Sequence, residues 1–356
     1  MHMADALVSP AVAVTMYAAS AAAAGVSLVQ LHKEEAAAPE LAKKKLPTMA
    51  VMSALVFAGQ MINYTIPGTG SSGHLCGGML LSAILGPWAG FLSMIVILAI
   101  QALFFADGGL LALGANVWNM AFYGCFVGYF LIYRPLMQGK LLSGKGRSKL
   151  VLASVLGCVV TLQLGALSVV VETSLSGITA LPFGAFAALM QPIHLAIGLV
   201  EGGITAAVLL FVYQTRPELL QCASAGAKNR CSRRAALAIL AAAALVIGGG
   251  LSLLASSNPD GLEWSLFGNE EAGYSANMGL DEEAYGAESA AAEKAAAVQE
   301  KTSLLPDYSF AGSDSAAGTS VSGLVGCALV AALAACISLA GRAARKKSGK
   351  KQASAG

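Results

Sequence analysis

Long apolar stretches separated by short polar turns follow one another along the chain from its first residues to residue 341. Several of them reach the roughly 20 residues that a helix needs to cross about 30 Å of hydrocarbon, whereas membrane barrels show short segments of alternating polarity. Hydrophobic residues make up 56% of the chain and charged residues only 12%. The pattern predicts an all-α polytopic membrane protein and disfavours a soluble enzyme.

Seven apolar segments are predicted within the first 214 residues. The stretch from 75 to 106 is too long for one membrane helix at about 1.5 Å per residue, so we expect it to break at Pro87. The expected segments are 7–31, 48–66, 75–86, 87–106, 111–133, 150–171 and 184–213. Two further segments, 235–255 and 321–341, predict a helical hairpin with a long loop between them.

The predicted organisation has four parts, which are a seven-segment module (1–214), a basic linker (215–234), a two-helix hairpin (235–341) and a basic tail (342–356). Residues 257–320 hold twelve of the twenty acidic residues and two of the 22 basic ones. Lys and Arg beside membrane helices stay cytoplasmic, so the basic loops and tail are expected inside and the acidic loop outside. The N-terminus is then expected outside the cytoplasmic membrane of a bacterial or archaeal cell, and the C-terminus inside.

Two histidines, His2 and His74, are candidate metal ligands, because this topology places both at the outer face. A free α-amine on Met1, the amide nitrogen of His2 and its imidazole can close fused chelate rings on one ion. A fourth nitrogen from His74, in "GSSGHLCGG", would complete a planar set. Nitrogen ligands in a plane suit Ni(II), Co(II) and Cu(II). The alternative left open is a terminal His2 without a role and a His74 that only caps a helix.

Other polar residues in apolar segments are candidates for supporting roles. Asn116 and Asn119 share a helix face and are candidates to orient a ligand imidazole, with polar contacts between helices as the alternative. His194 and Glu201 lie seven residues apart on one face, which predicts a buried polar pair that is structural or couples to a partner. Cys76 is expected to pack rather than to bind metal.

A second class of function also fits part of the pattern. The "GSSG" turn and a later histidine are typical of a rhomboid-like intramembrane serine protease, with Ser72 as nucleophile and His194 as its base. That interpretation leaves His2 without a purpose. A metal channel or sensor without energy coupling is a third alternative. No G-x-x-x-x-G-K-[ST] motif is present, so the sequence predicts no ATP hydrolysis by the P-loop route.

Five sequence blocks resemble one known family and occur in the order "MHMADALVSP", "VFAGQMINYTIPGTGSSGHLCGG", "LGPWAG", "QALFFADGGLLALGANVWNMAFYG" and "PIHLAIGLVEGGITA". They are similar to the cobalt/nickel substrate-binding membrane subunits of energy-coupling factor transporters, the CbiM/NikM family, over residues 1 to about 214. The resemblance implies a metal site formed by Met1, His2 and His74. It also implies import of Co(II) or Ni(II), with no permanent cofactor.

The second part of the chain carries a resemblance of its own. "SNPDGLEWSLF" and "LLPDYSF" look like the PDGLE domain that accompanies these transporters, in this chain fused to the first module. The implied partners are a transmembrane coupling subunit and two cytoplasmic ATPase subunits, in a lipid membrane and without nucleic acid. The fused hairpin is taken to favour cobalt, with nickel as the alternative. The acidic loop is expected either to concentrate cations or to act on the N-terminus.

Overall fold

The computed structural model describes residues 1–138, 146–178, 181–222, 229–274, 289–313 and 315–353. Parts of both basic loops (139–145 and 223–228) and residues 275–288 of the acidic segment lie outside the described residues. The first module contains α1 (Pro10–Ala37), α2 (Pro39–Gln60), α3 (Gly78–Leu85), α4 (Pro87–Phe104), α7 (Gly146–Ser176) and α8 (Phe183–Thr215). Between α4 and α7, one continuous helical segment is made of α5 (Leu113–Asn116), a π-helical stretch (Val117–Tyr133) and α6 (Arg134–Met137). Every predicted segment contains helix, and the all-α class is confirmed.

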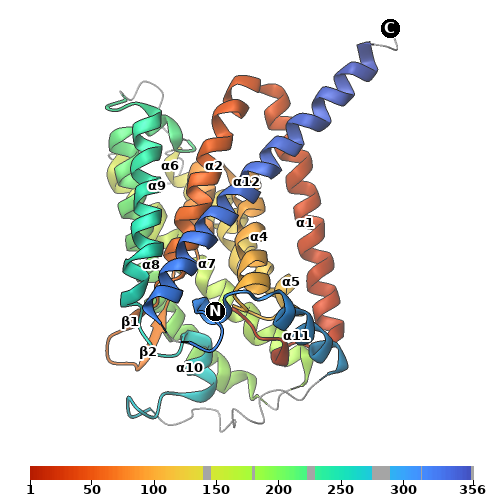
Figure 1. The fold of residues 1–356 in the computed structure, drawn as a ribbon. Helices are drawn as coiled ribbons and strands as arrows, with labels where there is room; N and C mark the ends of the chain where they lie inside the picture. The colour runs from red at the N-terminus through yellow and green to blue at the C-terminus, as the bar shows by residue number, and fades with distance from the viewer. Residues whose placement is uncertain (139–145, 179–180, 223–228, 275–288, 314, 354–356) are drawn as a thin grey trace.

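The helices form a bundle with two distinct ends (Figure 1). One end, called the site end below, carries the N-terminus, the hairpin of β1 (Tyr64–Ile66) and β2 (Ser71–Gly73), and the short helices α10 (Gly261–Phe267) and α11 (Ala290–Thr302). The opposite end carries the turn between α1 and α2 and the C-terminus. Segments far apart in the sequence therefore meet at the site end.

Six helical segments are long and apolar enough to cross a membrane among the described residues, and these are α1, α4, 113–137, α7, α8 and 316–337. The chain is therefore a multi-pass membrane protein. Three segments that the sequence predicts to cross are not among these six. They are α2, whose first turns carry three lysines, α3, which has only eight residues, and α9 (Arg233–Gly249), which has only 17.

The break between α3 and α4 falls at the predicted place. Gly86 adopts a left-handed φ of 85°, which glycine reaches without steric cost, and Pro87 opens α4 at a position where its missing N–H is no loss. With eight residues, α3 is about 12 Å long and cannot cross the bilayer. Every residue of α3 is buried, so this short helix is part of the core of the bundle.

The C-terminal hairpin, α9 and α12 (Ala316–Ala353), packs against α2, and Figure 1 shows α12 running across it. Small residues make this close approach possible. A Cβ on Gly323 would lie 1.9 Å from the Gly248 carbonyl oxygen of α9, and one on Gly326 would lie 2.1 Å from Phe57 Cζ of α2. Packing of this kind is what holds helices together in lipid, where the hydrophobic effect does not.

Candidate metal centre

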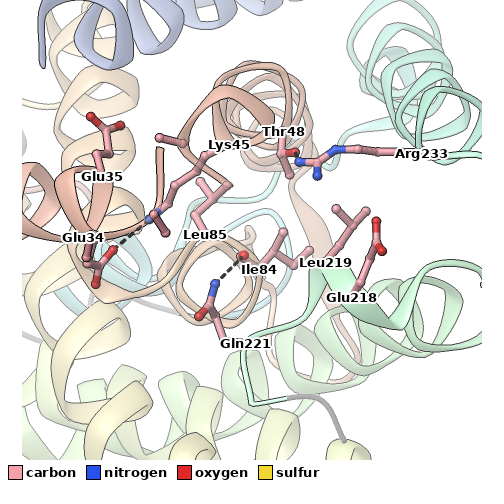
Figure 2. Close-up of a pocket in the computed structure, with 13 residues that line it drawn as sticks. Glu34, Glu35, Lys45, Thr48, Ile84, Leu85, Glu218, Leu219, Gln221 and Arg233 are labelled. Carbon is pink, nitrogen blue, oxygen red and sulfur yellow. Dashed lines mark hydrogen bonds and ion pairs between the residues drawn. The ribbon is translucent and has the colours of Figure 1, made fainter. Parts of the chain in front are cut away.

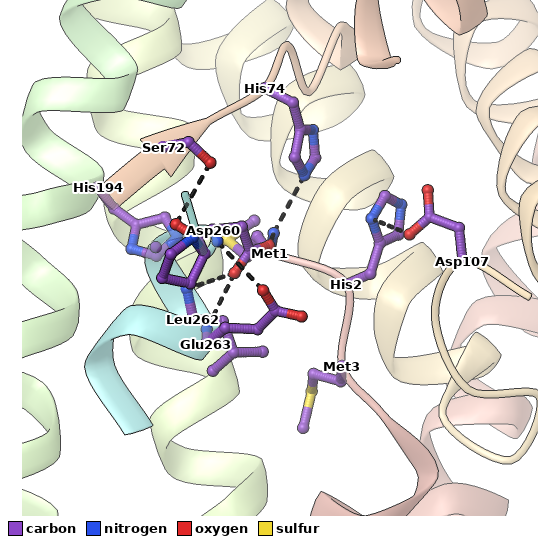
Figure 3. A network of polar contacts seen from close by, with 12 residues as sticks. Met1, His2, Met3, Ser72, His74, Asp107, His194, Asp260, Leu262 and Glu263 are labelled. Atoms are coloured by element: carbon purple, nitrogen blue, oxygen red, sulfur yellow. Dashed lines mark hydrogen bonds and ion pairs between the residues drawn. The ribbon is translucent and has the colours of Figure 1, made fainter. Parts of the chain in front are cut away.

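The first residues of the chain enter the site end, where Figure 3 shows Met1 and His2 near His74. The backbone of Met3 holds this segment in place. The Met3 amide donates to Asn116 Oδ1 at 2.7 Å, and the Asn116 amide donates back to the Met3 carbonyl at 3.1 Å. The Gly109 amide donates to the same carbonyl at 2.9 Å. These bonds fix the direction in which the two preceding residues project into the protein.

The strand β2 delivers His74 to the N-terminal amine. His74 Nε2 lies 3.1 Å from the Met1 nitrogen, and Nδ1 lies 3.0 Å from the Leu75 carbonyl. A carbonyl only accepts, so Nδ1 carries the ring proton and Nε2 carries the lone pair. Burial lowers the pKa of His74 to about 3, helped by the charge of the amine and by His2. The imidazole is thus neutral at physiological pH, which is the form that binds metals.

A second imidazole lies beside the first. The rings of His2 and His74 stack with centroids 5.1 Å apart and planes 14° apart. His2 Nδ1 lies 3.0 Å from Asp107 Oδ1, and the Tyr308 hydroxyl donates to the other oxygen of Asp107. Burial would raise the pKa of Asp107, but the contact with His2 and the two hydrogen bonds outweigh it and lower that pKa. The carboxylate therefore stays charged beside His2.

The C-terminal module brings Asp260 to the same place. Asp260 is the N-cap of α10, where its Oδ1 accepts from the Leu262 and Glu263 amides at 2.7 and 3.0 Å. The Glu263 carboxylate returns to the Asp260 amide, which completes a capping box. The remaining oxygen, Oδ2, forms an ion pair with the Met1 amine. Burial would raise the pKa of Asp260, but the amine and His74 outweigh it and lower that pKa.

Ser72 joins the two modules rather than acting as a nucleophile. Its amide donates to the Pro259 carbonyl and its hydroxyl to the Asn258 carbonyl, both at 2.8 Å. His194 Nδ1 lies 2.8 Å from the Met190 carbonyl, four residues earlier on α8. The serine hydroxyl is thus engaged by the C-terminal module and not by a histidine base. This arrangement contradicts the protease interpretation of the sequence.

Of the two alternatives for the asparagines, the described contacts match polar contacts rather than orientation of an imidazole. Asn116 instead grips the backbone of Met3, and the Asn119 amide donates to Glu172 Oε2 of α7 at 2.7 Å. Asn119 also reaches the Met3 sulfur at 3.5 Å. Asn116 therefore acts on the N-terminal segment, and Asn119 links two helices.

His194 and Glu201 are both buried, as predicted, and each contacts a different partner. The Glu201 carboxylate accepts the Cys76 and Gly77 amides at 2.9 Å each, across from α8 to the turn before α3. These bonds hold the segment that follows His74. The Cys76 thiol donates to a backbone carbonyl of the π-helical stretch at 3.1 Å, as expected for a packed cysteine.

Sequence reasoning overlooked the two carboxylates that contact the site. Asp107 was interpreted only as part of a "DGG" turn, and Asp260 only as part of a domain signature. Both lie in glycine-containing turns at the expected outer face, which is the signal that was available. Their partners, however, are more than a hundred residues away along the chain, and no local pattern predicts such contacts.

A cavity of about 450 Å³ opens at the site end beside His2 and His74. A second cavity of about 400 Å³ lies at the opposite end, where Figure 2 shows charges of both signs facing one another. There Lys45 Nζ lies 3.1 Å from a Glu34 oxygen, and Arg233 approaches α2. No histidine or cysteine is among the described residues that line this second cavity. Of the two cavities, only the one at the site end is lined by histidine in the described chain.

In the part of the chain that the structure describes, no three side chains of His, Cys, Asp or Glu converge as a metal site. A metal at the site end would therefore need backbone donors as well. The α-amine and the amide nitrogen of His2 are such backbone donors, and His74 Nε2 adds a side-chain nitrogen. Nδ1 is the His2 ring nitrogen nearest the backbone, so it is the one that can close a small chelate ring. The contacts of Asp260 with the amine and of Asp107 with Nδ1 would have to exchange for the metal.

A multi-pass bundle with buried nitrogen donors at one end is the construction of a membrane transport protein for a metal cation. The chain belongs to the CbiM family, since the family profile described as "cobalt uptake substrate-specific transmembrane region" matches residues 2–219. A PDGLE domain profile matches residues 234–343. The predicted resemblance to both families is confirmed.

Individual relatives agree with this assignment. A protein named putative fused nickel transport protein NikMN from Archaeoglobus fulgidus is 34% identical over 94% of this chain and 96% of its own. A cobalt transport protein CbiM from Sorangium cellulosum is 36% identical over 49% of this chain and 76% of its own. A crystal structure of a truncated transition metal transporter is 35% identical, with a TM-score of 0.50 over 60% of this chain and 98% of that one.

Proposed function

We propose that this protein is the substrate-binding subunit of an ATP-driven energy-coupling factor transporter that imports a late transition metal ion. The observation that carries the proposal is the neutral His74 imidazole, whose Nε2 lone pair faces the Met1 amine at 3.1 Å beside His2 in a CbiM-family chain. Neutral nitrogen donors suit Ni(II) and Co(II), whereas Mg(II) and Ca(II) prefer oxygen.

The proposed site holds the ion through the Met1 amine, the His2 amide nitrogen, His2 Nδ1 and His74 Nε2. Binding requires the amine and the amide to lose protons, as metal ligands generally do. In this structure Asp260 pairs with the amine and Asp107 contacts His2 Nδ1. The ion would have to displace both contacts to reach these two nitrogens. The ion is captured outside and released inside after a reorientation driven by partner subunits.

Nickel is the favoured cargo, which revises the expectation of cobalt from the sequence. Relatives that align with both modules are named for nickel, including the fused LarMN protein of Lactiplantibacillus plantarum, 32% identical over 74% of this chain and 78% of its own. The CbiM protein named for cobalt aligns with about half of the chain. Competitive uptake of labelled Ni(II) and Co(II) by cells with the complete transporter tests this choice. Preferred uptake of Co(II) would reverse it.

The partners in this proposal are a transmembrane coupling subunit and two cytoplasmic ATPases, because the chain carries no P-loop motif. We also propose the orientation with the site end outside, since basic residues cluster at the other end. The domain division at 1–214, 215–234, 235–341 and 342–356 stays part of the proposal.

The nitrogen site is tested by substituting His74 in the full chain. We expect His74→Ala to lose most of the nickel that the purified protein retains after dialysis, as measured by elemental analysis, because one of four nitrogen donors is gone. His32→Ala is the matched control, since His32 is an exposed histidine near the other end of α1. Equal nickel contents in wild type and His74→Ala would remove His74 from the site.

A further inference from the structure

The cavity at the site end has a strongly one-sided lining. Five carboxylates line it, and no lysine or arginine is among its described lining residues. The carboxylates are Asp5, Asp107, Asp260, Glu263 and Asp307. The first two belong to the first module and the other three to the C-terminal module. A cleft lined by one sign of charge attracts ions of the other sign and raises their local concentration.

Not all of this charge is already balanced. The Met1 amine pairs with Asp260, and His2 faces Asp107. Glu263 and Asp307 form no ion pair with a lysine or arginine within the described chain. The neighbouring Asp260 carboxylate and burial raise the pKa of Glu263 to about 7. Above that pH, the cavity carries negative charge on Glu263 and Asp307 that the nearby protein groups leave uncompensated.

A buried acceptor on the cavity wall points independently to a ligand. Gln60 lines the cavity, and its Oε1 has no hydrogen-bond partner in the described structure. The Gln60 amide donates to the Cys76 carbonyl at 2.8 Å, and the residue is only 4% exposed, so solvent barely reaches it. Buried acceptors without donors are costly, which indicates that a donor normally occupies the cavity.

The lining and these acceptors match one kind of ligand. Carboxylates and the Gln60 carbonyl oxygen accept hydrogen bonds, and the waters around a divalent cation all donate. Six waters at about 30 Å³ each fill about 180 Å³, so the ion with its water shell fits in about 450 Å³. The lack of three converging ligand side chains in the described chain argues against direct coordination here.

We propose that this cavity is a docking site for a hydrated divalent cation, adjoining the nitrogen site and built jointly by the two modules. The inference rests on the proposed transport function, in which the docked ion exchanges its waters for the nitrogen ligands next to it. Docking depends on charge and on water-mediated hydrogen bonds. It therefore accepts hard and soft divalent ions alike, while the nitrogen site selects among them.

Mn(II) is a suitable probe, because it keeps oxygen ligands and disfavours a planar nitrogen site. Binding of Mn(II) to the full chain in detergent at low salt is followed by the electron paramagnetic resonance signal of the free ion. We expect saturable binding that about 0.5 M salt abolishes, since a solvent-separated ion is screened.

At pH 8, where Glu263 is charged, Asp307→Asn and Glu263→Gln should each weaken Mn(II) binding about tenfold, as Coulomb's law gives for a divalent ion one water layer from a carboxylate. Both changes preserve local structure. Asp307 has a φ of 51°, a region that asparagine also tolerates, and glutamine supports a capping box. Glu300→Gln, on the exposed face of α11, is the control and should leave Mn(II) affinity unchanged.

The outcomes separate this inference from the proposed transport function. Equal Mn(II) affinities in wild type, Asp307→Asn and Glu263→Gln, or an equal loss in Glu300→Gln, would overturn the docking site and leave nickel retention unaffected. His74 lines the cavity but is neutral, so a His74→Ala protein that binds Mn(II) normally but no longer retains nickel supports docking that does not use the nitrogen ligands. Nickel retention by His74→Ala would instead count against the nitrogen site alone.

Discussion

Substitutions of Asp260 separate two roles that its carboxylate combines. One oxygen pairs with the Met1 amine, and the other caps α10 by accepting from two backbone amides. Asparagine removes the charge but is as good an N-cap as aspartate, whereas alanine removes both functions. Comparing Asp260→Asn with Asp260→Ala therefore distinguishes the ion pair from the cap.

The expected size of each effect follows from burial and from the chemistry of the amine. Met1 is 6% and Asp260 15% exposed, and stranding one charge of a buried pair costs about 3–5 kcal/mol. An α-amine in a peptide loses its proton near neutral pH, so at pH 7 becoming neutral costs only about 1 kcal/mol. The less costly route limits the loss of unfolding free energy in Asp260→Asn to about 1 kcal/mol. Alanine adds the lost cap, about 1 kcal/mol more.

Nickel affinity should move in the opposite direction to stability. The metal binds the neutral amine, so the ion pair with Asp260 has to break first in the wild type. Both variants lack that competitor, and we expect each to bind Ni(II) about fivefold more tightly, which corresponds to about 1 kcal/mol. Titration calorimetry of the full chain measures the affinity, and thermal unfolding in detergent measures stability.

The pattern across the two variants is the test. We expect equal gains in nickel affinity but a lower melting temperature for Asp260→Ala than for Asp260→Asn. Weaker nickel binding by Asp260→Asn at an unchanged melting temperature would refute the competition between carboxylate and metal, because the carboxylate would then belong to the metal-bound site.

Three further outcomes are expected from contacts around the site. Tyr308→Phe removes the hydroxyl that donates to Asp107 and should lower the unfolding free energy of the full chain by about 1 kcal/mol in thermal unfolding; an unchanged melting temperature would count against that bond. Gly77→Ala places a Cβ 2.3 Å from a valine side chain at a φ of +84°, so it should destabilise the protein by at least about 1 kcal/mol, whereas Gly203→Ala, with open space around it, should not. The pKa of Asp260 is lowered because the amine and His74 outweigh burial, so its stabilising effect is complete above the ordinary value of 3.8 and is lost as the pH falls. Melting temperatures should drop on acidification below about pH 4 in wild type, and less so in Asp260→Asn.

The helical segments could be predicted because their causes are local. Apolar length identifies them, and Pro87 with Gly86 divides one long stretch into α3 and α4. The docking of α12 on α2 could not be predicted, because it depends on small residues such as Gly326 meeting a partner more than two hundred residues away. A small residue in a membrane helix indicates that another helix can pack closely there, but it does not identify that helix.

The candidate site shows the same limit. Ligand chemistry singled out Met1, His2 and His74, and the structure brings these three together. Asp107 and Asp260 were not anticipated, because only the folded chain brings a turn after α4 and the cap of α10 to the N-terminus. Residue type predicts which groups can bind a metal, whereas the groups that compete for those ligands are set by tertiary contacts.

The central claim is that the α-amine of Met1 is itself a metal ligand, and a protein with one glycine added before Met1 tests it most directly. The extension keeps every side chain but moves the free amine away from His2. A glycine added at the C-terminus is the control. After loading with Ni(II) and dialysis, elemental analysis should find an equimolar amount of nickel in wild type and control and almost none in the N-terminally extended protein. Full nickel retention by the extended protein would contradict the account.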